Sequence, residues 1–123
     1  MDFVFHQTLD RPFLESMYGD DLVYAKEVFA SFLKETRAEF EEIKQLYGRN
    51  DLKGMRYKLH KIKPTFSFVG LTALTESTEK IISTCDASLN TTDIEPGCSE
   101  LFTTIENSFL LIAGELARME KHS

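Results

Sequence analysis

His60 is a candidate nucleophile of this sequence because cationic and hydroxyl side chains lie near it at helical spacing. On a helix, Lys63 lies one turn after it and Ser67 two turns after it, on the same side. A neutral imidazole has an ordinary pKa of about 6.5, so at neutral pH it is largely unprotonated and can act as a nucleophile. Lys63 could pair with phosphoryl oxygens as a point charge, and Ser67 could donate one hydrogen bond to them. Lys61 and Arg56 could assist more loosely.

The apolar pattern around His60 predicts that its ring faces solvent. From Leu52 to Val69, apolar residues recur at alternating three- and four-residue steps, which is the period of a helix. At about 100° per residue, His60 points about 130° away from the mean direction of that stripe. A lone histidine is more often structural than catalytic. That alternative usually places the ring in a core, however, and this ring is on the opposite face.

The same helix carries an excess of positive charge in an otherwise acidic chain. Residues 52–75 contain no Asp or Glu and have a formal charge of +5, which leaves −11 for the rest of the chain. One interpretation is a solvated basic face, and the other is a docking face that steers an acidic partner toward it. Nucleic acid is a poorer fit, because the surrounding negative charge repels phosphate. The positive residues are Lys53, Arg56, Lys58, Lys61 and Lys63.

The outward side of this helix also carries apolar residues. Tyr57 and Phe68 lie nearly opposite the core stripe, and Pro64 lies between them at helical spacing. An apolar centre with a charged rim is typical of a protein-docking surface. The alternative is that the amino-terminal residues 3–5, with two Phe and a Val, fold over these side chains.

Pro64 should disturb the helix next to His60. Proline has no N–H to donate, and the acceptor left without a partner is the carbonyl of His60 itself. The cost is about 3 kcal/mol if nothing compensates. The helix could bend there, or it could break so that Pro64 opens a new helix. The unbroken apolar stripe from Leu52 to Val69 favours a bend.

Start and stop signals divide the chain into amphipathic helices joined by short turns. Four long segments with apolar stripes are what an antiparallel four-helix bundle requires. We therefore predict an all-α fold: an up-and-down four-helix bundle with a short additional N-terminal helix, forming one domain over residues 1–123. A polar loop is expected from Asp86 to Asp93. The expected helices are a short one over 10–19 and longer ones over 20–48, about 51–70, 72–85 and from Pro96-Gly97 onward.

Composition excludes several classes of protein. The 123-residue chain has 14 Lys and Arg against 20 Asp and Glu, which argues against a dedicated nucleic-acid binder. Its longest apolar run, 109–113, is too short to span a bilayer, and the amino terminus lacks the basic region of a secretory signal. We expect a cytoplasmic protein that does not insert into a membrane. The Met start and polar Lys-His-Ser end suit a complete small protein. We expect a monomer, because each apolar stripe can be buried within one bundle.

No second site is evident in the sequence. It lacks the GxxxxGK[ST] loop and the Gly-rich nucleotide fingerprint, so we expect no ATP binding and no autophosphorylation. His6 and His122 have no partners at ligand spacing, and no metal site is expected. Two pairs of glutamates, 41 with 42 and 76 with 79, are interpreted as solvated helix faces rather than acid–base pairs. Cys85 and Cys98 are too few for a disulfide framework and fall on apolar stripes, so both are expected in the core.

The segment 59–70, LHKIKPTFSFVG, resembles the signature of histidine-containing phosphotransfer (HPt) domains. In that family an exposed His is followed by an apolar residue at two, Lys at three, a small residue (usually Gly) at four, Ser or Ala at five and Gly at ten. The stretch 13–33 also looks like the family's entry into its first long helix. The resemblance spans nearly the whole chain. The residues in register with the signature are Ile62, Lys63, Thr65 and Gly70.

The resemblance implies a phosphorelay intermediate that is a carrier rather than an enzyme. His60 would accept a phosphoryl group from the phosphoaspartate of a receiver domain, or from a sensor kinase system, and pass it to a response-regulator receiver. The partners would be that receiver and/or a hybrid sensor histidine kinase. The chain itself would need no cofactor, because the Mg²⁺ would lie in the partner's aspartate pocket. Pro64 stands where Gly is usual, and we interpret it as a variant that is also compact against the helix.

Two other functions fit parts of the pattern. One is a helical adaptor that binds a receiver or another partner through Tyr57, Pro64 and Phe68 without phosphoryl transfer. The other is a small hydrolytic enzyme that uses His60. The second is a weak alternative, because no carboxylate lies within two turns on the same helix face to orient the imidazole.

Overall fold

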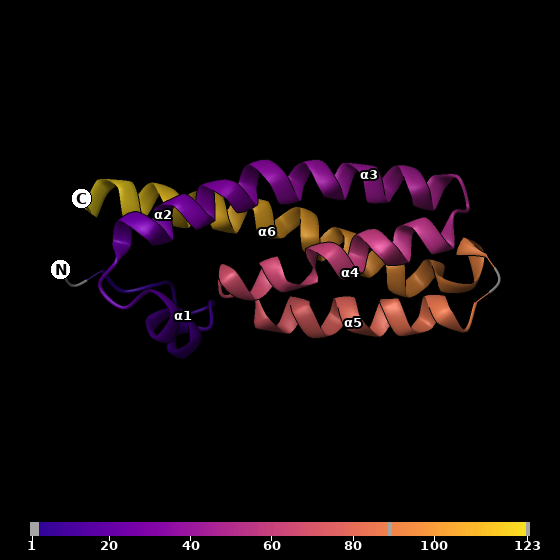
Figure 1. Ribbon diagram of the computed structural model, residues 1–123, viewed down its shortest axis with the longest axis horizontal. Helices are drawn as coiled ribbons and strands as arrows, with labels where there is room; N and C mark the ends of the chain where they lie inside the picture. The colour runs from indigo at the N-terminus through magenta and orange to yellow at the C-terminus, as the bar shows by residue number, and fades with distance from the viewer. Residues whose placement is uncertain (1–2, 89, 123) are drawn as a thin grey trace.

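The chain is helical throughout its regular elements. The computed structural model describes residues 3–88 and 90–122, and within them a short helix, α1 (Arg11–Tyr18), precedes four long helical arms that run up and down beside one another (Figure 1). The predicted four-helix bundle with an additional N-terminal helix is confirmed. The first arm consists of α2 (Leu22–Ser31), a π-helical turn η1 (Phe32–Thr36) and α3 (Arg37–Gly48); the others are α4 (Leu52–Phe68), α5 (Thr72–Asp86) and α6 (Glu95–His122).

The first arm differs from the single regular helix expected over 20–48. It begins after Asp21, whose carboxylate accepts a hydrogen bond from the Tyr24 backbone N–H at 3.0 Å. Midway along the arm, the backbone takes the wider π-type turn η1, which the apolar spacing did not reveal. Thr36 at the end of η1 is buried, and its hydroxyl donates a hydrogen bond to the Thr65 hydroxyl of α4 at 3.2 Å. The π turn therefore ends at a polar contact with α4.

The core fills the space between the arms and is made by the predicted stripes. Aromatic rings meet across it: Phe32 lies 6.0 Å from Phe66, and Phe40 lies 5.9 Å from Phe109, between ring centroids. Burying a side chain of this size stabilises the fold by about 1.5–3 kcal/mol. Cys85 and Cys98 are buried as free thiols, as expected, and burial raises the pKa of Cys98 to about 12. Other fully buried residues are Phe29, Leu59, Ile105 and Ile112.

Helix α1 holds the carboxyl end of α4. The backbone N–H of Asp10, the residue that caps α1, donates to the Gly70 carbonyl at 2.9 Å, and the Tyr18 hydroxyl donates to the Phe68 carbonyl at 2.6 Å. Gly70 has a φ of 81°, and a Cβ at this position would lie 2.7 Å from Cδ1 of Leu14. The positive φ and this close approach of α1 both require glycine.

The connection between α5 and α6 is more regular than the polar loop expected over 86–93. Helix α5 continues through Asp86, and Asn90 caps a short 3₁₀ helix, η2 (Thr91–Ile94). Ile94 is buried, which attaches the connection to the core. Helix α6 then begins at Glu95, one residue before the Pro-Gly pair taken as its start.

Candidate functional site

His60 lies in the middle of α4 and its side chain is exposed, as its angular position predicts. Pro64 lies inside α4, so the alternative in which it opens a new helix is wrong. Because proline has no N–H, the His60 carbonyl lacks the usual helical donor. In the same turn, the Thr65 hydroxyl donates a hydrogen bond to the Ile62 carbonyl at 2.7 Å. The backbone beside the imidazole is therefore helical, with a compact ring one turn away.

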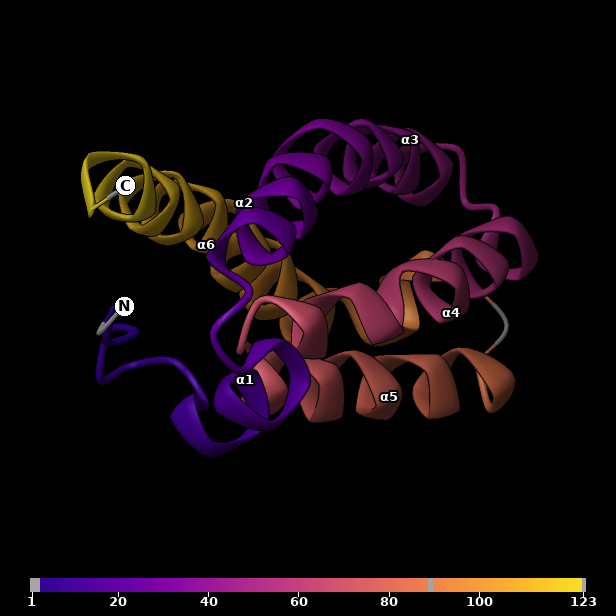
Figure 2. The same ribbon diagram turned by 60° about the vertical axis from the view of Figure 1, so that its left-hand side comes forward.

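Helix α4 lies between α3 and α5 (Figure 2), and ion pairs join it to both. On the α5 flank, Lys63 Nζ lies 2.9 Å from Glu79 Oε2, and Arg56 Nε lies 2.5 Å from Asp86 Oδ1. The two cations are seven residues apart on α4, and the two carboxylates are seven apart on α5. His60 falls between the two cations, so this flank brackets the imidazole with two ion pairs.

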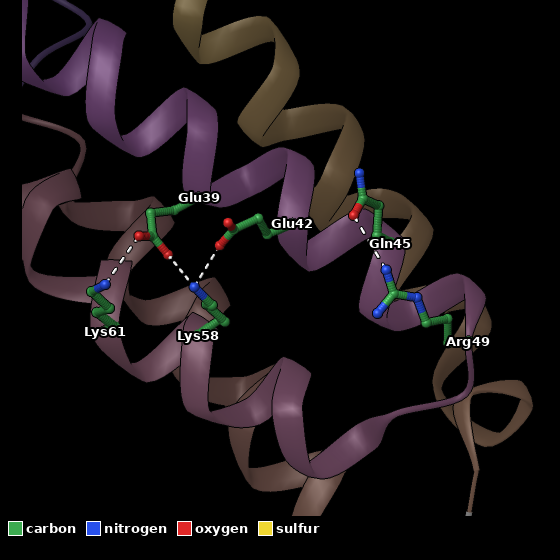
Figure 3. A network of polar contacts seen from close by, with 6 residues as sticks. All are labelled: Glu39, Glu42, Gln45, Arg49, Lys58 and Lys61. Carbon is green, nitrogen blue, oxygen red and sulfur yellow. Dashed lines mark hydrogen bonds and ion pairs between the residues drawn. The ribbon is translucent and has the colours of Figure 1, made fainter.

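The α3 flank carries a branched network of the same kind (Figure 3). Lys58 Nζ donates to Oε2 of Glu39 at 3.0 Å and to Oε2 of Glu42 at 2.5 Å. Lys61 Nζ donates to the second oxygen of Glu39, Oε1, at 3.0 Å. The hydrogen bonds from both lysines lower the pKa of the Glu39 carboxyl. Glu39 thus bridges two cations of α4 that lie nearly one turn apart.

These pairs add to both sequence interpretations of the basic face. Four of its five cations are already paired with carboxylates of α3 or α5, and among the described residues Lys53 is the member without an ion pair. Carboxylates of the same chain therefore offset most of the positive charge of this face, and the solvated face and the docking face both stay predictions. The run of basic residues could be recognised from the sequence of one helix. The carboxylates that oppose it come from two others, whose register a single-helix pattern does not give.

The predicted phosphoryl-binding side chains have partners within the chain. Lys63 is half-buried against Glu79, and the Ser67 and Thr75 hydroxyl oxygens lie 2.9 Å apart. Although its ion pair with Lys63 was not predicted, Glu79 is exposed, as expected for a solvated helix face. Its pKa is lowered, first by the hydrogen bond from Lys63 and then by the charges of Lys63, His60 and Arg56. No pattern within a single helix gives the register that brings Glu79 beside Lys63.

Apolar side chains are exposed beside the imidazole, as predicted. Tyr57 is 68% exposed and Phe68 is 38% exposed, and Pro64 is exposed as well. The amino-terminal segment does not cover them. Its Phe5 ring stacks on Phe29 with centroids 6.0 Å apart.

The rest of that segment packs against α6. The His6 backbone N–H donates to Glu115 Oε2 at 2.7 Å, and Arg118 donates to the Val4 carbonyl at 3.0 Å. The alternative in which residues 3–5 fold over the outward side of α4 is wrong.

A groove of about 490 Å³ runs between the first arm and α4. Its α4 wall includes Lys61 and Phe68, so it opens next to the face that carries His60. The opposite wall includes η1, and π turns are frequent at functional sites. The groove is lined by Val28, Ser31, Phe32, Glu35, Thr36, Ala38, Glu39, Lys61, Ile62, Thr65 and Phe68.

The described part of the chain shows no cluster of three or more His, Cys, Asp or Glu side chains that could hold a metal ion. The His6 ring contacts the Thr8 hydroxyl at 2.7 Å, and the His122 ring packs on Phe3. No helix within residues 3–88 and 90–122 is both long and apolar enough to cross a membrane.

Comparison with known families identifies the chain. The model of the Hpt domain matches residues 27–121, well over half of the sequence, so the chain belongs to the Hpt domain family. No curated protein and no solved structure matched it. Hpt domains are phosphohistidine carriers of two-component systems and not enzymes in the usual sense, and the chain has a phosphotransfer-related role.

Proposed function

We propose that this Hpt domain is a phosphorelay intermediate in which His60 carries the phosphoryl group. It accepts the group from the phosphoaspartate of a receiver domain, or from a sensor kinase system, and passes it to a response-regulator receiver. The observation that carries the proposal is the exposed imidazole in the middle of α4, with an ammonium one turn away. A carrier of this kind needs its histidine within reach of another protein rather than in a closed pocket.

The chemistry requires little more than a free ring nitrogen and local charge neutralisation. The distal nitrogen of His60 attacks phosphorus, the bond from phosphorus to the aspartate oxygen breaks, and the carboxylate leaves with the bonding electron pair. The ring keeps its proton on the other nitrogen and becomes a phosphorylated imidazolium. Lys63 and Ser67 turn from Glu79 and Thr75 toward the phosphoryl oxygens. The Mg²⁺ that assists transfer belongs to the receiver, and we assign no cofactor to this chain.

The docking surface proposed for the receiver is mainly apolar. Tyr57, Pro64 and Phe68 are exposed on the His60 face, and the groove beside Phe68 can take an apolar side chain of the partner. Arg56 and Lys61 are bound in ion pairs and form the rim of this surface. We propose that a monomer docks in this way in the cytoplasm, on a receiver, a hybrid sensor histidine kinase, or both in turn.

A second candidate function is an adaptor that binds the receiver without transfer. Pro64 in the place of the usual Gly and the hold of Glu79 on Lys63 favour it. Binding that survives His60→Ala, together with no labelling of the parent chain, would select the adaptor.

Labelling separates the two functions. The chain is incubated with a panel of phosphorylated receivers, and we expect an adduct that is labile in acid and stable in alkali. His60→Gln should abolish the adduct, whereas His6→Gln, at another exposed histidine, should leave it unchanged. A His60→Gln chain that takes up as much label as the parent would overturn the assignment.

A further inference from the structure

Glu79 occupies a position that the transfer chemistry described above does not use. Its carboxylate holds the ammonium of Lys63 at 2.9 Å, and Lys63 lies one helical turn after His60. The lysine side chain is only 23% exposed and is held between α4 and α5, whereas the Glu79 side chain is 54% exposed. Glu79 is therefore placed to control where the Lys63 ammonium points.

A phosphoryl group on His60 would change the charge balance of this flank. A protonated His60 ring lowers the pKa of Glu79, so the two side chains influence each other through space. A phosphoryl group adds negative charge on the His60 side of Lys63. Like charges that share one cation disfavour each other. The Lys63 ammonium has three N–H donors and can contact the Glu79 carboxylate and the phosphoryl group at once. Each of these two anionic groups is then only partly neutralised.

The other ion pair on this flank differs in its relation to His60. Arg56 lies one turn before the histidine and is paired with Asp86 in the last turn of α5. Lys63 lies on the Pro64 side, where the helix is missing a backbone donor and the outward face is compact. Of the two pairs, Lys63–Glu79 includes the cation that we assign to phosphoryl binding.

We propose that Glu79 is a positioning residue that holds Lys63 while His60 is bare and competes with the phosphoryl group for it afterwards. Glu79 thereby shortens the lifetime of the phosphohistidine and favours release of the group to the next receiver. This inference rests on the proposed function of His60 and adds a residue that sets how long the group is kept.

The test compares phosphohistidine lifetimes in four chains: the parent, Glu79→Gln, Glu79→Asp and Glu76→Gln. Phosphoramidate phosphorylates exposed histidines without a receiver, and ³¹P NMR at neutral pH then follows hydrolysis of the His60 adduct. The signal that is absent from a His60→Gln chain identifies it. Glu76 is the matched control because it is exposed on α5, one turn before Glu79, and no ion pair involves it among the described residues.

We expect Glu79→Gln to lengthen the lifetime about threefold, the size of effect that one exposed charge pair gives. Glu76→Gln should leave the lifetime unchanged. Glu79→Asp should keep it within about twofold of the parent value, because the charge and not the exact side chain is responsible. The equilibrium ratio of phosphohistidine to receiver phosphoaspartate should move by the same factor in Glu79→Gln.

Two results would overturn the proposal. An unchanged lifetime in Glu79→Gln would mean that Glu79 is only a structural partner of Lys63. A shorter lifetime would mean that Glu79 supports the phosphoryl group by anchoring the lysine. Failure of the proposed function looks different: no receiver transfers to the parent chain, while the receiver-free lifetimes still report on Glu79.

Discussion

The two flanks of α4 are joined to their neighbours by the same kind of ion pair, yet they offer different surfaces. On the α3 flank, Lys58 and Lys61 are bound to Glu39, and the pairs border an apolar groove. On the α5 flank, Lys63 is bound to Glu79 within one turn of His60. In the proposed relay, similar charge pairs border the partner's binding surface on one side of the helix and control charge at the reacting group on the other.

The largest difference between the flanks should appear in the transfer rate. Lys63→Gln removes the proposed charge-assisted hydrogen bond to the phosphoryl group. Such a bond is worth about 1.5–3 kcal/mol, so transfer should slow about tenfold to a hundredfold. Lys58→Gln removes an equal charge on the α3 flank and should change the rate by less than about twofold. Rapid-quench transfer from one receiver measures both. Equal losses in the two variants would mean that the flanks do not differ in this way.

The groove on the α3 flank can be tested by filling it. Ala38→Phe places a ring in the groove, and receiver affinity should fall about tenfold because a central apolar contact is lost. The matched control is Ala113→Phe on the exposed face of α6, which should not alter binding. Calorimetric titration with the receiver gives the affinity, and circular dichroism checks the fold. Unchanged receiver affinity of Ala38→Phe would mean that the groove is not part of the docking surface.

Because both flanks neutralise their own cations, association with a receiver should depend only weakly on salt. Steering by a free +5 helix would slow association strongly as ions screen it. We expect the association rate constant to change by less than about threefold between about 0.05 and 0.5 M salt. Stopped-flow mixing measures it. A steep decrease would support the docking interpretation in which the basic residues attract an acidic partner.

The smallest effect concerns the stability that the α3 flank provides. The pKa of Glu39 is lowered in the folded chain, so its contribution is fully present above the ordinary value of 4.5 and is lost as pH falls through the lower folded value. For a partly exposed network we expect about 1 kcal/mol. The free energy of unfolding should therefore differ between the parent and Glu39→Gln above about pH 5 and converge in acid. Urea unfolding across pH measures this, and a constant difference at all pH values would contradict it.

Much of the fold and the exposed position of His60 were predictable from single-helix patterns. The apolar stripe from Leu52 to Val69 predicted both the helix and the outward direction of His60. When one face of a helix is buried, residues on the opposite face point to solvent. Asp10 caps α1, and Gly70 follows the end of α4 with a positive φ. Capping and positive φ are local properties.

What could not be predicted depends on how helices face one another. Glu39 and Glu79 become partners of α4 only once α3 and α5 are placed beside it, and periodicity within one helix carries no such register. The π turn at Phe32–Thr36 left the three- and four-residue spacing of the buried residues along the first arm almost unchanged. The amino-terminal segment gave no helical pattern at all, so its packing against Phe29 and Glu115 was open.

The central claim is that the exposed His60 imidazole itself receives the phosphoryl group. The most direct measurement is mass spectrometry of the intact chain after incubation with a phosphorylated receiver, followed by peptide mapping at alkaline pH. We predict the mass gain of one phosphoryl group, its loss in acid, and its location on the α4 peptide at residue 60. A phosphoryl group on another residue, or no mass gain with any receiver of the panel, would contradict the account.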